Sequence, residues 1–257
     1  MRFIDTHCHL GAPELGAGRA TLIARAKAAG VVAAIAVGEH YEDNLRVLEL
    51  AAAEPFVLPA LGHHPCQLER AREDVPRTLR LLEENRARVV AIGEVGLDYR
   101  RAELEAERAE QRAVFRQFIE ASRRLDLPLS VHSRSAGHYV IEMLAEHGPV
   151  RAALHAFDGK VRYALRGAAL GLYFSLPATV LVSQQKQKVA CALPLERLLL
   201  ESDAPALGPA PDRPSEPALC AEVARAVAEL RGEALERVAA AAYENSLTLF
   251  RLALPAG

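Results

Sequence analysis

The chain has 257 residues, of which 51% are hydrophobic and 25% are charged, and its formal net charge at pH 7 is -2. This near-neutral balance argues against a long electrostatic track along duplex nucleic acid, which needs clustered Lys and Arg, but it leaves room for phosphate binding at a single site. No apolar stretch approaches the roughly 20 residues that cross a bilayer, and the first residues turn polar too soon for a signal peptide. We therefore expect one globular domain over residues 1–257, cytoplasmic and without a membrane partner.

Short apolar runs alternate with helical patterns along the chain. Runs typical of buried parallel strands lie at residues 3–4, 31–37, 57–61, 89–92, 127–131, 152–154, 172–174 and 198–200. Helical periodicity marks residues 22–29, 44–53, 75–86, 106–125, 139–147 and 217–229, and a closing helix is expected at residues 233–251. The alternation favours βαβ units, and eight units in roughly 250 residues predict one (β/α)8 TIM barrel. The alternative is a doubly wound open sheet, which would gather its site at one switch point.

Good metal ligands stand at the ends of five of these runs. They are His7, His9, Glu94, His132, His155 and Asp203. The carboxyl ends of all strands of a barrel meet at one rim, so side chains from these strands would converge there. An open sheet would not bring them together, and the pattern therefore predicts a barrel enzyme with a metal site.

The first two ligand segments differ in kind. Alternate residues of a strand share a face, so His7 and His9 project together while Cys8 points away. Glu94 follows an apolar run and is flanked by Gly93 and Val95, and burying its charge would be costly unless a cation offsets it. An ion pair with a basic side chain of the barrel is the alternative for Glu94.

A carboxylate also follows the last apolar run. Asp203 can ligate an ion and accept a proton from an activated water. Glu201 shares its face by parity and is the competing candidate, although it would lie deeper in the barrel. We favour Asp203. Asp98, which follows the Glu94 strand, can belong to the site or simply begin the next loop.

Taken together, these segments resemble the TatD family of metal-dependent deoxyribonucleases. The matching motifs are the His7–His9 pair and residues 93–99, 132–134, 155–157, 201–205 and 245–250. They follow the family's order over nearly the whole chain. The resemblance implies a TIM barrel of the amidohydrolase type that hydrolyses phosphodiester bonds of nucleic acid, typically from a 3′ end.

The resemblance also implies how the site is used. One divalent ion would be held by His7, His9, Glu94 and Asp203, and a second by Glu94, His132 and His155. Glu94 would then bridge the two ions, and Asp203 would take the proton of the water that they activate. We expect magnesium, manganese or zinc as the ions, and single-stranded DNA or a 3′ end as the substrate.

Substrate contacts are carried over on the same basis. The family's Gly-x-His-Pro turn lies at residues 62–65, and the expected contacts are His64, Ser133, Arg134 and Phe157. The planar guanidinium of Arg134 suits a phosphate oxygen. The loop after Asp203 departs from the family, since Ala206 stands where an aromatic residue is usual. The expected metal ligands therefore match the family, while the loop expected to contact the substrate differs from it.

Two other functions remain open. A small-molecule amidohydrolase or lactonase can use the same barrel, but many such relatives bridge their metals with a modified lysine where this chain has Glu94. A non-catalytic subunit of a larger assembly is the second alternative, and the altered loop keeps it open. The remaining histidines, His40, His63, His138 and His147, are expected at the surface or in packing.

Overall fold

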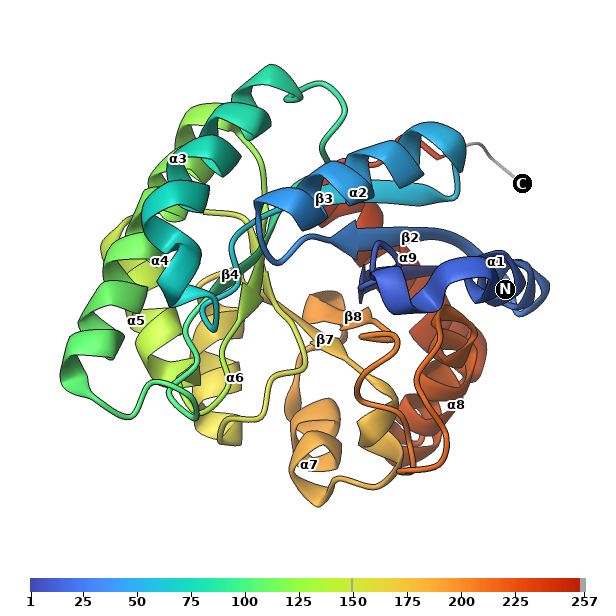
Figure 1. Cartoon of the computed structure of the whole chain (residues 1–257). Helices are drawn as coiled ribbons and strands as arrows, with labels where there is room; N and C mark the ends of the chain where they lie inside the picture. Colours follow the sequence, from blue (N-terminus) through green and yellow to red (C-terminus); the bar gives the residue numbers. More distant parts are fainter. Residues whose placement is uncertain (149, 255–257) are drawn as a thin grey trace.

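The computed structural model describes residues 1–148 and 150–254. Eight parallel strands form one sheet in sequential order, and the helices follow one another around its outside (Figure 1). The strands are β1 Phe3–Cys8, β2 Val31–Val37, β3 Val57–Leu61, β4 Ala91–Gly96, β5 Leu129–His132, β6 Ala152–Leu154, β7 Tyr173–Leu176 and β8 Leu198–Leu200. The predicted TIM barrel is confirmed, because a doubly wound sheet would reverse its strand order at a switch point.

Seven of the helices in the described residues lie where the alternation placed them, with differences in their bounds, whereas α6 and α7 were not predicted. They are α1 Arg19–Ala28, α2 Tyr41–Ala53, α3 Leu68–Glu84, α4 Glu105–Leu125, α5 Gly137–Glu146, α6 Val161–Ala169, α7 Gln184–Ala192, α8 Cys220–Arg231 and α9 Leu235–Phe250. Short 3-10 segments occupy η1 Pro13–Gly18, η2 Ala178–Leu181, η3 Leu195–Arg197 and η4 Pro217–Leu219. The α8 helix therefore begins three residues after its predicted start, because the first turn of that segment is 3-10.

The strands β1 and β4 extend beyond their apolar runs. β1 continues through Thr6 and His7, and β4 continues through Glu94 to Gly96, although the hydrophobic pattern stops earlier. These polar side chains are buried inside the protein, where they have polar partners. They can therefore belong to a buried strand although they interrupt its apolar pattern. The candidate ligands His7, His9 and Glu94 therefore lie within or directly after β1 and β4.

Hydrogen bonds join the first strand to the segment after the last. The Asp203 N–H donates to the His7 carbonyl at 2.9 Å, and the His9 N–H donates to the Ala204 carbonyl at 2.8 Å. The buried Asp5 carboxylate accepts from the Ser202 backbone N–H at 2.9 Å. These contacts bring the barrel near to closure and hold the ligands of its first and last strands in register.

The amino-terminal part of the barrel interior is apolar. Ile35, Ala91, Ala153 and Leu199 pack there with Phe250 from α9. Because side chains alternate along a strand, the next inward positions after Ala153 and Leu199 are those of His155 and Glu201, as the chain leaves β6 and β8. The interior thus changes from apolar to polar toward the carboxyl ends of the strands.

Within residues 1–148 and 150–254, no helix has both the length and the apolar character needed to cross a membrane.

Candidate metal centre

All six predicted ligands lie together at the carboxyl ends of the strands. They are His7 in β1, His9 one residue after it, Glu94 in β4, His132 at the end of β5, His155 directly after β6 and Asp203 three residues after β8. The geometry brings them into two clusters that share Glu94. We name the clusters A and B.

Cluster A is formed by His7, His9, Asp203 and one oxygen of Glu94. The Glu94 Oε2 atom lies 3.4 Å from His7 Nε2 and 3.6 Å from His9 Nε2. The Asp203 Oδ1 atom lies 3.6 Å from His7 Nε2 and 3.2 Å from His9 Nε2. Two imidazole nitrogens and two carboxylate oxygens therefore converge on one point.

Cluster B is formed by His132, His155 and the other oxygen of Glu94. The Glu94 Oε1 atom lies 2.7 Å from His132 Nδ1 and 2.8 Å from His155 Nε2, and these two nitrogens are 3.2 Å apart. His64 stands at the edge of this cluster, with Nε2 3.4 Å from Glu94 Oε1. The Glu94 carboxylate is thus divided between the clusters, one oxygen to each.

Partners outside the clusters fix two of the imidazole rings. The Ser130 hydroxyl is 2.8 Å from His7 Nδ1, and Asp98 Oδ2 is 3.0 Å from His132 Nε2. A ring that donates its N–H to such a carboxylate keeps the other nitrogen as a lone pair, which is the form that binds a metal. The His132 lone pair then faces cluster B.

The donor set fits divalent cations. His7 Nε2 is buried and has no hydrogen-bond partner among the described residues, which is unusual for a polar atom unless an ion or water serves it. Nitrogen–oxygen pairs 3.2 to 3.6 Å apart in cluster A, and 2.7 to 2.8 Å apart in cluster B, can both lie at the roughly 2.0–2.2 Å that metal–nitrogen and metal–oxygen bonds require. Each cluster therefore offers donors that suit a cation.

His64 presents a donor to the clusters. The Cys66 backbone N–H donates to His64 Nδ1 at 3.1 Å, so the neutral ring carries its own proton on Nε2. That N–H points toward Glu94 and His132. This arrangement favours the predicted contact with substrate over metal ligation.

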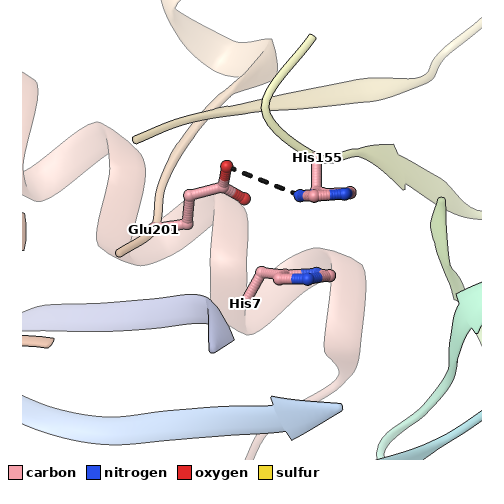
Figure 2. A group of neighbouring side chains, drawn as sticks. All are labelled: His7, His155 and Glu201. Carbon is pink, nitrogen blue, oxygen red and sulfur yellow. Dashed lines mark ion pairs between the residues drawn. The ribbon is translucent and has the colours of Figure 1, made fainter. Parts of the chain in front are cut away.

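Glu201 lies beside His155, and the two side chains point toward each other (Figure 2). Its Oε1 atom is 3.8 Å from His155 Nδ1, while its carboxylate accepts from the Ala156 backbone N–H at 2.8 Å and from the Ser175 hydroxyl. The His155 ring stacks on His7 with a centroid separation of 3.9 Å. Glu201 is thus already engaged by Ala156 and Ser175, and it faces His155 Nδ1 without a hydrogen bond, which favours Asp203 as the ligand.

The clusters keep their carboxylates ionised. Burial opposes charge on Glu94, but His155, His64 and His7 outweigh it and hold the pKa of Glu94 well below its usual range. Burial likewise opposes charge on His9, but Asp203 and Glu94 prevail and raise the pKa of His9 to about 9. Without a metal, the centre therefore holds protons where cations would bind.

The other three residues predicted to contact substrate differ in how far their side chains are exposed. Arg134 has 49% of its side chain exposed, and its Nε lies 3.9 Å from Asp98 Oδ2. Ser133 is buried, and its hydroxyl has no hydrogen-bond partner among the described residues. Phe157 is buried and packs edge-on against Phe174 with centroids 5.1 Å apart, which favours a supporting role over direct contact.

Two residues near the site were not singled out from the sequence. Ser130 lies behind His7, with its hydroxyl 2.8 Å from His7 Nδ1, a contact that only the folded barrel makes. Lys186 on α7 is buried and donates to the Ala156 carbonyl, next to His155. A lysine in a polar helix gives no sign of burial, so the sequence offered no signal for it.

A parallel eight-stranded barrel with histidine and carboxylate donors at its carboxyl-terminal rim is the architecture of metal-dependent hydrolases of the amidohydrolase type. The family model described as TatD related DNase matches residues 4–251. The chain belongs to this family, and the resemblance inferred from the motifs is confirmed.

Relatives agree with this assignment over nearly their full lengths. The chain is 40% identical to "Deoxyribonuclease TATDN3" of Homo sapiens, with 96% of this chain and 94% of that protein covered. It is 34% identical to "Uncharacterized metal-dependent hydrolase YjjV" of Escherichia coli, with 98% of each covered. The crystal structure of YjjV, a TatD homolog from Escherichia coli, superimposes with a TM-score of 0.91 at 32% identity, covering 98% of this chain and 99% of that one.

Proposed function

We propose that this chain hydrolyses phosphodiester bonds of nucleic acid as a 3′–5′ exodeoxyribonuclease that uses two divalent ions. The observation that carries the proposal is the Glu94 carboxylate, whose two oxygens face two separate histidine clusters. A bridging carboxylate of this kind is what a two-ion site needs, and two-ion sites are common in enzymes that cleave phosphate esters. The name of the human relative, a deoxyribonuclease, supports DNA as the substrate.

In this proposal each residue has one task. Cluster A, with His7, His9 and Asp203, would hold one ion, and cluster B, with His132 and His155, would hold the other. Bound ions would supply Lewis-acid activation of a water molecule and of the phosphate. Asp203 would accept the proton, because it is held in the ionised form: burial opposes its charge, but His9, His155 and His7 outweigh that effect and hold the pKa of Asp203 below its usual range.

Three hydrogen-bond donors near the clusters can donate to phosphate oxygens. Arg134 offers an exposed guanidinium, Ser133 a buried hydroxyl without a partner among the described residues, and His64 the N–H on Nε2. Charge-assisted and neutral donors in one place suit a phosphodiester better than an amide or lactone. The alternative of a small-molecule amidohydrolase rests on the shared barrel alone, since the structurally similar dihydroorotase of Campylobacter jejuni is only 17% identical.

The test compares wild type with Asp203→Asn on a 5′-labelled single-stranded oligonucleotide in magnesium, manganese and zinc. Wild type should shorten the strand stepwise from its 3′ end. Asp203→Asn keeps the size and one oxygen but removes the proton acceptor, so we expect a fall in rate of about 100-fold or more while metal remains bound. Asp126, the C-cap residue of α4, provides the matched control, because Asp126→Asn makes the same chemical change at the opposite, amino-terminal end of the barrel.

Elemental analysis of both variants separates loss of metal from loss of catalysis. Intact oligonucleotides under every metal, together with cleavage of a lactone or amide by the same preparation, would show that the nuclease proposal is wrong. Release of nucleotides from the 5′ end would refute the direction alone.

A further inference from the structure

We propose that a row of aromatic rings on the rim beside cluster B binds the unpaired bases of a nucleic acid strand; this inference rests on the proposed nuclease function. The row consists of Tyr99, Tyr139, His138 and Tyr163, and we name it the ring row. Neighbouring ring centroids are 5.0 Å apart for Tyr99 and Tyr139, 3.8 Å for His138 and Tyr139, and 5.1 Å for His138 and Tyr163. The rings are therefore in continuous contact.

The ring row lies at the same end of the barrel as the metal centre. Tyr99 follows β4, His138 and Tyr139 lie in the first turn of α5, and Tyr163 lies in the first turn of α6. Helices of a βα barrel begin at the rim where the preceding strand ends, so these three segments share the carboxyl-terminal rim. Figure 1 shows α4, α5 and α6 following one another around the barrel.

The row begins next to the ligands. Tyr99 directly follows Asp98, whose carboxylate is 3.0 Å from His132 Nε2. The Tyr99 N–H donates to the Arg134 carbonyl at 3.0 Å, which fixes Tyr99 to the loop that carries Arg134, a proposed phosphate contact. In this proposal, a strand with a phosphate at cluster B would place its next nucleotide near Tyr99 and continue along the ring row.

The central rings are the ones available to a ligand. Arg108 lies over the Tyr99 ring at 4.9 Å, and Arg162 lies over the Tyr163 ring at 4.7 Å. Tyr139, between them, is 40% exposed. Arginines thus lie over a ring at each end, while Tyr139 in the middle is the exposed ring that a ligand can reach.

Charge and ring type together indicate the ligand. Single-stranded nucleic acid binds where bases stack on aromatic side chains and basic groups track the phosphates. Exposed basic residues flank the row, at Arg134 on one side and Arg162 on the other, whereas the nearby Arg112 is paired with Glu105. A duplex keeps its bases stacked internally, so an unpaired strand is the form that this surface fits.

The experiment measures the equilibrium binding of a short 5′-labelled oligonucleotide to metal-loaded protein by fluorescence anisotropy. It is carried out in the slowed Asp203→Asn background, so that binding is read without hydrolysis. Two ligands are compared, one with normal bases throughout and one with abasic residues at its 3′-terminal positions. Tyr139→Ala is compared with Tyr139→Phe, which keeps the ring.

Tyr139→Ala should weaken binding of the normal oligonucleotide by about 5- to 100-fold, the range expected for losing one base–aromatic stack. Tyr139→Phe should bind nearly as well as the parent, and the abasic oligonucleotide should respond little to either change. The matched control is Tyr243→Ala, because Tyr243 in α9 also carries an arginine, Arg2, over its ring but lies beside the amino end of β1.

Equal loss for the normal and abasic oligonucleotides on Tyr139→Ala would overturn the proposal, as would no loss at all. Loss on Tyr139→Phe equal to that on Tyr139→Ala would overturn it too, since the ring would then not be the cause. The nuclease function is judged separately by wild-type hydrolysis. Base-dependent binding without hydrolysis would therefore support the ring row while refuting the proposed activity.

Discussion

Glu94 is the residue on which the proposed two-ion site depends. It is 2% exposed, yet its carboxylate stays charged because imidazoles surround it from β1, β3, β5 and β6. A buried charge without compensation would cost several kcal/mol. The histidines offset that cost whether they carry protons or bind cations. Glu94 can therefore stay ionised in both the metal-free and the metal-bound centre.

Asp98 offers a prediction at the same scale, because it touches cluster B but not cluster A. Asp98→Asn removes the charged acceptor that fixes the His132 tautomer, and the loss of such an orienting partner costs about 10- to 100-fold in metal affinity. We expect the ion at cluster B to weaken by this amount, with the ion at cluster A retained. A two-site metal titration, read by calorimetry, checks this. Equal weakening of both ions would contradict the role assigned to Asp98.

The convergence of the six candidate ligands could be predicted from the sequence, whereas the contact of Ser130 with His7 could not. His132 and Asp203 stand at the ends of apolar runs, a position that carries meaning once a barrel is assumed. Ser130 lies inside such a run and contacts His7 across 123 positions of sequence, a tertiary relation that no local pattern contains. The division of Glu94 between two clusters came from the family resemblance, and the side-chain geometry now gives it a physical basis.

At the scale of elements, the alternation of strands and helices was readable, but several bounds were not. α6 and α7 are nine-residue helices and were not among the predicted ranges. α3 begins at Leu68, seven residues before its predicted start, and continues through Pro76. Its buried face runs on both sides of the proline, so packing of that face outweighs the lost hydrogen bond.

Gly96 at the end of β4 supports a prediction about strand pairing. Its φ is +139°, and a Cβ there would lie 2.1 Å from the His132 carbonyl oxygen of β5. Gly96→Ala must therefore push β5 away as well as strain the backbone, and we expect it to destabilise the protein by roughly 2–4 kcal/mol, the scale of severe steric mutations.

The matched control is Gly171→Ala, since Gly171 has φ +88° but nothing within 4 Å of its added Cβ. It should cost only the backbone strain, about 1–2 kcal/mol. Urea unfolding of both variants gives the two free energies. A Gly171→Ala cost equal to that of Gly96→Ala would mean that the approach of β5 is not what requires glycine at position 96.

At the scale of the whole molecule, the barrel joins two kinds of interior. The amino-terminal part is filled by apolar side chains with Phe250 of α9, and the carboxyl-terminal part by charged and imidazole groups. Apolar packing must supply the stability, because burying so many ionisable groups opposes folding unless each is paired. Ion binding to the folded state would add to that stability by mass action.

The last prediction follows from this coupling and concerns pH. In the metal-free protein the pKa of His9 is raised to about 9, above the ordinary value of 6.5, because Asp203 and Glu94 outweigh burial. A group whose pKa is raised on folding stabilises the fold below its unfolded value, and this contribution is lost as pH rises through the folded value. The metal-free protein should therefore lose stability between pH 6.5 and pH 9.

Metal binding should show the opposite trend, because an imidazole must be neutral to ligate and its proton competes with the ion. Thermal unfolding in chelator and in excess manganese, over the same pH range, measures both curves. Asp5, whose pKa burial raises to about 8 and which is not a proposed ligand, contributes to both curves, so their difference isolates the centre. The gap between the unfolding midpoints should widen toward pH 9. A gap that is constant above pH 6.5 would mean that the ligands of the metal-free centre hold no protons there.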